Sequence, residues 1–560
     1  MNEKPPLELI MRPGVDPSSA PNKPPLPPRD YDCRQESGLV IERNLPVRLR
    51  DGVTIYLDLY RPRGAAGERD LPALLAWGPY GKHALTNRVF WPVSGVDPDW
   101  LSPLTPFEGP DPVFWGAAGY AVAVADPRGA WLSEGEFHHN GPVEAEDCRE
   151  TIEWLAAQSW SNGKVGMTGV SYLACIQYYV APLKPEPLAA LNPCEGFSDW
   201  YREFACHGGI PETGFLPRAS DNIRFSTTRT EDTWASAQAH PLMDAYWRSK
   251  EPALEAIETP VYVIASWADQ GLHTRGTLEA FRRISSAEKW LEAHGQKKWA
   301  YYYRPETRER QRVFFDHFLK SKNTAVSGWP RVRFEVRECA GKSKVREANE
   351  WPLADVEART LWLDAKTGRL SDAKPVEEAS VAYDACKGSA AFDYQFSTDA
   401  ELTGSMKLTL WFEAAGARDA DLFVAVQKLD DKGAPVGFTF YSFFENGPVA
   451  LGWLRASHRA LDRARSTPLQ PVHLHDREEP LPEGSPVPLD IEIWPSSTLF
   501  RAGETLRVII QGSDIYKEGS PGLPFALHEQ TRNEGTHIIH AGGAHDSRLL
   551  MPVASQGRNR

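Results

Sequence analysis

A buried strand, a sharp turn and a helix are predicted in succession within residues 164–181, K-V-G-M-T-G-V-S-Y-L-A-C-I-Q-Y-Y-V-A. The apolar run 165–168 predicts the strand, and the segment from Tyr172 onward is apolar and free of Gly and Pro, as in a helix. Ser171 lies at the apex of the turn. This arrangement is typical of a nucleophile elbow, in which the N–H of the next residue can bind an oxyanion at the helix start.

The elbow motif is incomplete. The pattern G-x-S-x-G places a second glycine at position 173, where this chain has Leu173, followed by the small Ala174. Gly169 is present and leaves room for the crossing of strand and helix. By itself the turn is equally compatible with a strand-to-helix loop in which Ser171 has no catalytic role.

Size and charge narrow the class of protein. A chain of 560 residues exceeds one compact core, so at least two domains are expected. Acidic residues outnumber basic ones by 75 to 62, and the net charge of −13 argues against a nucleic-acid partner, which would require a basic face.

Cysteine usage and hydropathy suggest a cytoplasmic location. The cysteine count is odd, at seven, and there is no C-x-x-C, so reduced thiols are expected rather than disulfides or a zinc knuckle. The N-terminus has no apolar core of signal-peptide length, and no run approaches 18 apolar residues. We therefore expect a soluble cytoplasmic protein with no membrane partner.

The first half of the chain predicts an α/β core. Residues 1–35 are Pro-rich and predict an extended arm, which either clasps a neighbour in a homo-oligomer or hangs free. An entry hairpin at 40–60 is followed by alternating strands and helices, which predict a mostly parallel sheet. The expected strands are 71–77, 119–125, 165–168, 260–266 and 289–293; the expected helices are 144–158, 172 onward, 274–285 and 310–320, and residues 85–112 are expected to form a long ordered loop.

Two further regions depart from this alternation. Residues 197–257 are polar and aromatic, which predicts a largely helical cap inserted into a catalytic domain at 36–327. After residue 328, short alternating strands recur with turns between them, which predicts an all-β sandwich or jelly roll at 328–560. Its expected strands are 332–337, 360–363, 406–412, 422–426, 489–493, 506–510 and 537–539.

Three residues stand in the chain order of a hydrolase triad. A serine nucleophile needs a base, and the base needs an acid that orients it. Ser171, Asp269 and His294 each follow a predicted strand, in the order Ser, Asp, His. His273 and His317 are rival bases. The first follows Asp269 by only four residues and the second lies within a predicted helix, so both fit the order poorly.

The sequence resembles the cocaine-esterase and X-Pro dipeptidyl-peptidase superfamily of serine hydrolases. The resemblance covers nearly everything after residue 39. It is carried by R-D-G-V-T-I-Y-L-D-L-Y-R-P (50–62), G-P-Y-G-K (78–82), D-P-R-G (126–129), S-E-G (133–135), G-V-S-Y-L (169–173), W-A-D (267–269), H-G (294–295), G-W-L-R-A-S-H-R (452–459) and I-W-P-S-S-T-L-F-R-A-G (493–503).

The resemblance implies an α/β-hydrolase core with a helical cap and a C-terminal jelly roll of the galactose-binding-like type. It also implies that the hydroxyl of Tyr80 is an oxyanion donor together with the N–H of Tyr172, and a donor of this kind is worth roughly 3 to 4 kcal/mol of barrier. Acyl transfer of this type requires neither a metal nor an organic cofactor.

The sequence says less about the acyl group of the substrate than about the catalytic residues. Family members that take α-amino esters have carboxylates shortly after the catalytic Asp, whereas this chain has Gln270, Gly271 and Leu272. We expect the acyl pocket to be shaped by aromatic residues, namely Trp200, Phe204 and Trp267.

Three hypotheses remain open. The first is a hydrolase of esters with small, mostly apolar acyl groups. The second is an X-Pro dipeptidyl-peptidase, for which Asp199 and Glu203 would bind the free N-terminus of the substrate. The third is a ligand-binding protein whose hydrolase domain is inert.

Overall fold

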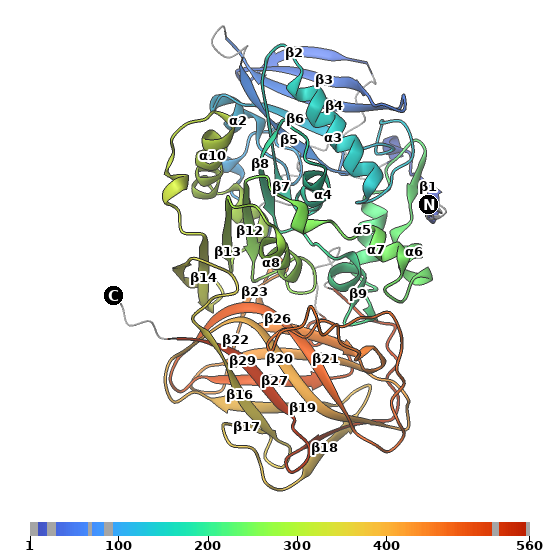
Figure 1. Ribbon diagram of the computed structural model, residues 1–560, viewed down its shortest axis with the longest axis vertical. Helices are drawn as coiled ribbons and strands as arrows, with labels where there is room; N and C mark the ends of the chain where they lie inside the picture. Colours follow the sequence, from blue (N-terminus) through green and yellow to red (C-terminus); the bar gives the residue numbers. More distant parts are fainter. Residues whose placement is uncertain (1–8, 20–29, 65–69, 83–92, 518–525, 556–560) are drawn as a thin grey trace.

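Two parts of different architecture make up the molecule (Figure 1). The computed structural model describes residues 9–19, 30–64, 70–82, 93–517 and 526–555. The first part is a sheet covered by helices, and the second consists almost entirely of strands. The predicted fold class, an α/β-hydrolase core followed by a β-rich domain, is confirmed.

The first part is built on one mixed sheet whose centre is parallel. Antiparallel strands flank it at both edges, and seven strands from β6 to β14 run parallel to one another. In spatial order the strands are β2 (Asp32–Glu36), β3 (Leu39–Arg48), β4 (Thr54–Pro62), β6 (Ala121–Asp126), β5 (Leu71–Trp77), β7 (Ser161–Val170), β8 (Leu188–Cys194), β12 (Val261–Ser266), β13 (Lys289–His294), β14 (Val332–Cys339) and β15 (Lys342–Ala348).

The central strands are apolar on both faces because helices cover both. Every residue of β5 is buried. The consecutive residues Leu74 and Leu75 of this strand belong to different core clusters, because successive side chains of a strand point to opposite faces of the sheet. Helices α3 (Pro142–Ala156) and α8 (Thr274–Arg283) pack in one cluster, and α2 (Pro112–Ala117) and α10 (Pro305–Leu319) pack in the other.

The predicted cap is a mixture of short helices and short strands. Its elements are the π-helical turn η4 (Tyr201–Ala205), β9 (Cys206–His207), β10 (Ile210–Pro211), α5 (Phe215–Asn222), β11 (Arg229–Glu231), α6 (Thr233–Ala239), α7 (Ala245–Ser249) and η5 (Leu254–Ala256). Strand β1 (Met11–Pro13), within the Pro-rich arm, pairs with β11. Residues 11–13 of the arm therefore lie on the cap of the same chain, whereas the end of the arm enters β2 of the main sheet. Residues 1–8 and 20–29 of the predicted arm lie outside the described residues.

The second part is a two-layer β-sandwich. In one layer β20 (Ala400–Ala415) pairs with β26 (Val487–Phe500) on one side and with β28 (Thr536–Ala541) and β29 (Arg548–Ala554) on the other. In the other layer β21 (Asp421–Leu429) lies between β25 (Ala450–Arg455) and β27 (Thr505–Gln511). The remaining strands are β16 (Val356–Asp364), β17 (Arg369–Ser371), β18 (Ala379–Asp384), β19 (Ser389–Gln395), β22 (Pro435–Val436), β23 (Phe438–Phe440) and β24 (Phe444–Gly447).

The two parts are joined through the sheet itself. Strand β14 begins after residue 328, where the domain boundary is predicted, yet it pairs in parallel with β13 and so extends the first part's sheet. It also touches β26 of the sandwich, where Arg337 is opposite Thr498. The boundary at 327/328 stays a prediction, since it falls on a continuous structure rather than on a linker.

Two more observations complete the fold. Within the predicted loop 85–112, residues 83–92 lie outside the described residues, and the described remainder contains η2 (Pro98–Trp100) and the start of α2. Across the described ranges, none of the helices has both the length and the apolar character required to cross a membrane.

Candidate active site

The strand, turn and helix around Ser171 have the geometry of a nucleophile elbow. Strand β7 ends at Val170 and helix α4 (Tyr172–Val180) begins one residue after Ser171. Ser171 has φ 59° and ψ −116°, a conformation that non-glycine residues rarely adopt and that persists only where the surroundings impose it. The predicted turn is therefore present, with the serine at its apex.

The glycine missing from the motif has a local explanation. A Cβ added at Gly169 would lie 2.5 Å from Cβ of Leu173, and one added at Gly78 would lie 2.4 Å from Leu173 Cδ1. Leu173 thus fills space that two facing glycines leave open. The crossing of strand and helix is preserved because the small residues lie opposite position 173 rather than at it.

Ser171, His273 and Asp269 are connected side chain to side chain. Oγ of Ser171 lies 3.2 Å from Nε2 of His273, and Nδ1 of His273 is paired with Oδ2 of Asp269. His273 and Asp269 are both buried, at 1% and 2% exposure. This is the order of contacts that a nucleophile, a base and an orienting acid require.

The loop after β12 explains how two residues only four apart can meet. Gly271 adopts φ +88°, which reverses the chain, and the N–H of His273 donates to the carbonyl of Asp269 at 3.2 Å. The turn returns the imidazole to the carboxylate just before α8 begins at Thr274. His273 was predicted only as a rival base because of this short spacing, and the glycine in G-L-H was the signal that could have identified it.

His294, the base predicted from chain order, lies elsewhere, and that prediction is wrong. It ends β13 with its side chain fully buried, its ring stacked on Tyr301 at 3.7 Å between centroids. Its Nε2 lies 3.2 Å from Oε1 of Glu195. The position beside Ser171 is occupied by His273 instead.

Burial and one cation set the protonation states of the site. Burial, and after it the ammonium of Lys298, lowers the pKa of His273 to about 4, although Asp269 acts in the opposite direction. Burial alone would raise the pKa of Asp269, but Lys298 and His273 hold it well below its usual range. At neutral pH the imidazole is therefore neutral and the carboxylate is ionised, as a triad requires.

Tyr80 stands beside the nucleophile, as the resemblance implies. It lines the same cavity as Ser171, and Ser171 and Glu108 are both hydrogen-bonding neighbours of its hydroxyl. Burial, followed by the charge of Glu108, raises the pKa of Tyr80 well above its usual value, so the phenol keeps its proton. The donor role of Tyr80 and of the Tyr172 N–H stays a prediction.

One group of residues has the spacing of metal ligands. Among the described residues, Glu195, Asp269 and His273 bring one ligand atom each within 4.8 Å of one another. The ammonium of Lys298, however, lies 3.1 Å from Oδ2 of Asp269 and 3.4 Å from Nδ1 of His273. A metal cation at this point would be repelled by a resident charge, so these residues fit a metal poorly.

An apolar cavity of about 180 Å³ opens onto Ser171. Trp200 and Phe204 of the cap line it together with Phe215 of α5, and their role in substrate binding stays a prediction. The prediction for Trp267 is wrong: this side chain is fully buried outside the cavity, and its indole N–H donates to the carbonyl of Glu335 at 2.9 Å.

The second part of the molecule supplies one wall of this cavity. Tyr441, Phe443 and Phe444, at the tip of the β23–β24 hairpin, are lining residues. The hairpin is hydrogen-bonded to the segments that follow β12 and β13. The N–H of Tyr441 donates to the carbonyl of Ala268 at 2.9 Å, and the N–H of Lys298 donates to Oγ of Ser442 at 3.2 Å.

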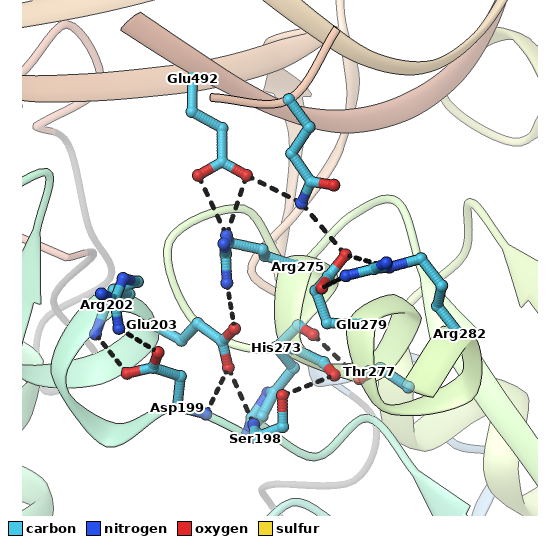
Figure 2. Close-up of polar contacts among 12 residues, drawn as sticks. Ser198, Asp199, Arg202, Glu203, His273, Arg275, Thr277, Glu279, Arg282 and Glu492 are labelled. Atoms are coloured by element: carbon cyan, nitrogen blue, oxygen red, sulfur yellow. Dashed lines mark hydrogen bonds and ion pairs between the residues drawn. The ribbon is translucent and has the colours of Figure 1, made fainter. Parts of the chain in front are cut away.

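Asp199 and Glu203, the proposed anchors for a substrate N-terminus, are engaged in buried ion pairs (Figure 2). Asp199 pairs with Arg202 at 2.6 Å, and Glu203 pairs with Arg275 at 2.7 Å. Arg275, in the first turn of α8, also pairs with Glu492 of the second part at 2.9 Å. Both carboxylates are thus neutralised within the protein.

Comparisons with known proteins match both parts. Residues 51–224 match the model of the X-Pro dipeptidyl-peptidase (S15 family), and residues 324–550 match that of the X-Pro dipeptidyl-peptidase C-terminal non-catalytic domain. Cocaine esterase of Rhodococcus sp. (strain MB1 Bresler) is 26% identical over 386 residues, which are 58% of this chain and 62% of that esterase.

Solved structures match this chain over most of its length. An aminopeptidase from the marine sediment archaeon Thaumarchaeota archaeon superposes with a TM-score of 0.71 at 16% identity, covering 96% of this chain and 99% of that one, which shows the shared fold. A CocE/NonD family hydrolase (SACOL2612) from Staphylococcus aureus superposes with a TM-score of 0.89 at 40% identity, covering 92% of this chain and 94% of that one. The chain therefore belongs to the CocE/NonD family of serine hydrolases, with the S15 catalytic region and its C-terminal β domain.

Proposed function

We propose that this serine hydrolase cleaves esters of small apolar acyl groups, with Ser171 as nucleophile, His273 as general base and Asp269 as the acid that orients His273. The observation that supports this most directly is the 3.2 Å separation between Oγ of Ser171 and Nε2 of His273. That distance is within the range in which a base can remove the proton of a nucleophile.

The proposed reaction proceeds through an acyl-enzyme. His273 takes the proton of Ser171 as Oγ attacks the carbonyl carbon, and the carbonyl oxygen becomes an oxyanion held by the Tyr80 hydroxyl and the Tyr172 N–H. Collapse of this intermediate breaks the bond to the alcohol, which receives the proton from His273. A water molecule, deprotonated by His273 in turn, releases the acid and restores Ser171.

The chemical class of the acyl group follows from the cavity walls. Aromatic side chains from the cap and from the β23–β24 hairpin line most of it, and aromatic walls favour an uncharged acyl group. Its charged lining residues include Asp269 and Lys298, which pair with each other at 3.1 Å. We infer a preference for benzoyl or branched short-chain acyl esters over acetyl or charged ones.

The dipeptidyl-peptidase alternative is less well supported. It requires an anion for the ammonium of the substrate, and Asp199 and Glu203 are already paired with arginines. The alternative of an inert hydrolase domain is disfavoured because His273 is neutral and in contact with the nucleophile.

A substrate series tests the proposal. Purified protein and the Ser171→Ala variant are assayed with p-nitrophenyl acetate, butyrate and benzoate and with Gly-Pro-p-nitroanilide. We expect kcat/KM to rise from acetate to benzoate, with no release from the anilide and none by the variant. If p-nitroaniline is released from the anilide faster than p-nitrophenol from any ester, the dipeptidyl-peptidase hypothesis would replace that of an ester hydrolase.

Location and assembly remain proposals as well. We propose a cytoplasmic enzyme, since the seven cysteines are free thiols. Recovery of the protein outside the cytoplasmic fraction of its source cells would contradict this. A homo-oligomer is compatible with the sequence, and size-exclusion chromatography with light scattering decides the state.

A further inference from the structure

A buried lysine shares the carboxylate that orients His273. Lys298 is the first residue of helix α9 (Lys298–Tyr303), directly after the loop that follows β13, and is 5% exposed. Its Nζ lies 3.1 Å from Oδ2 of Asp269, the same oxygen that is paired with Nδ1 of His273. Its distance to Nδ1 of His273 is 3.4 Å. One oxygen thus connects a cation and the base.

Further titratable groups near this cluster include two carboxyl groups and a histidine that contacts one of them. Glu195 follows β8, Glu108 lies on the loop before α2, and His294 ends β13. Burial raises the pKa of Glu195 well above its usual value and that of Glu108 to about 7, and burial lowers the pKa of His294 to about 3. In mildly acidic solution Glu108 and His294 are therefore neutral, and burial favours the neutral form of Glu195 as well. Asp269 and Lys298 are then the charges beside His273.

We propose that Lys298 is a positioning residue that fixes Asp269 against His273 and, as a cation beside the imidazole, keeps His273 neutral and able to accept the Ser171 proton in acidic solution. The inference rests on the proposed function, because it assigns His273 as the base. A triad with Asp269 alone would place a net negative charge beside the imidazole and favour the imidazolium. The added ammonium cancels that charge at short range.

This arrangement has a functional consequence. General-base catalysis fails when the base is protonated, so kcat/KM falls as the pH drops through the pKa of His273. That pKa is lowered to about 4 by burial and by Lys298. The enzyme should therefore remain active at a pH where a histidine of ordinary pKa, about 6.5, is mostly charged.

The test measures the rate at which Ser171 reacts with a fluorophosphonate between about pH 4 and pH 9, beside kcat/KM for p-nitrophenyl benzoate over the same range. Three variants accompany the wild type. Lys298→Met removes the charge, Lys298→Arg keeps it, and Lys297→Met is the matched control, since Lys297 pairs with the exposed Glu445 at 3.4 Å.

We expect the wild-type acid limb to lie below about pH 5 and to move toward neutrality by about one pH unit or more in Lys298→Met. Lys298→Arg should keep the wild-type limb even if its maximal rate is lower, and Lys297→Met should match the wild type throughout. A wild-type limb between about pH 6 and 7, or a Lys298→Met profile that is lower but unshifted, would overturn the inference.

If Lys298→Met does not fold, a wild-type limb between about pH 6 and 7 still overturns the inference, and the comparison of Lys298→Arg with the wild type replaces that of Lys298→Met. Failure of the proposed function looks different: Ser171 would not react with the fluorophosphonate at any pH. A reactive Ser171 with an unshifted acid limb would retain the triad and reject only the role of Lys298.

Discussion

The C-terminal ends of β12 and β13 lie side by side in the same parallel sheet, and each region has a buried histidine: His273 in the loop after β12, and His294 at the end of β13. The loop after β12 curls back at Gly271, so His273 contacts both Asp269 and Ser171. Strand β13 ends at His294, which faces Glu195, and Lys298, the first residue of α9 after the following loop, contacts the Asp269 carboxylate. Chain order alone favours His294 as the base, whereas contact with Ser171 favours His273.

The largest expected effect separates the two histidines. His273→Ala should lower kcat/KM for an activated ester by about 10⁴-fold or more, because it removes the base. His294→Gln should change kcat/KM by less than about tenfold, although the loss of a buried stacked ring should lower the thermal midpoint. Steady-state kinetics and thermal unfolding of both variants provide the comparison. Comparable losses of activity in both would remove the distinction between the loops.

Tyr80→Phe tests whether the oxyanion forms beside Ser171, where His273 would position Oγ. If His273 sets the position of Oγ, the oxyanion forms within reach of the Tyr80 hydroxyl, and its removal should lower kcat by about 100- to 1,000-fold with a smaller change in KM. The measurement is a kcat and KM determination on one ester. Phe at this position keeps the ring that packs edge-on against Phe107, so the fold should be retained. A change confined to KM would show that Tyr80 only lines the cavity.

The hairpin that contacts both loops gives a smaller effect that depends on the substrate. Phe443→Ala should raise KM for a benzoyl ester by about tenfold and leave that for an acetyl ester nearly unchanged, because it removes only part of the apolar wall. Val376→Ala is the control, since that side chain is 90% exposed. An equal loss for both esters would mean that the hairpin positions the two loops rather than the acyl group.

The smallest effect concerns how the loop after β12 is held. Glu492→Gln leaves Arg275 paired with Glu203 alone, and should lower the free energy of unfolding by about 1 to 3 kcal/mol and the fluorophosphonate rate only a few-fold. Glu377→Gln, at a side chain that is 81% exposed, should change neither quantity. If Glu492→Gln slows labelling as severely as His273→Ala, α8 and not the loop itself determines where His273 lies.

Much of the fold was predictable because its signals are local. Continuous apolar runs identified β5 and β12, and the break in periodicity after residue 328 identified the sandwich. The strand assigned to 332–337 formed, but as β14 it joined the first sheet, because edge pairing depends on neighbours that are distant in sequence.

The site was only partly predictable. Ser171 and Asp269 follow strands, so their place at one sheet edge could be inferred, and the structure brings them together through His273. Trp267 was wrongly placed in the cavity because the side chain of a residue near Asp269 need not point the same way as Asp269 itself. His294 was chosen over His273 because the turn at Gly271, which brings His273 back to Asp269, leaves no periodic pattern in the sequence. Lys298 could not be found from sequence, since its role depends on a contact across 29 positions.

The β23–β24 hairpin, residues 438–447, supplies one wall of the cavity from the second part of the molecule. A nascent chain that has emerged only as far as α10 holds Ser171, His273 and Asp269, yet it lacks one wall of the acyl site and the Glu492 partner of α8. The wall of the cavity is therefore complete only once residues 438–447 have been added to the first domain. The same arrangement makes these ten positions a part of the cavity wall that is separate in sequence from Ser171, Asp269 and His273.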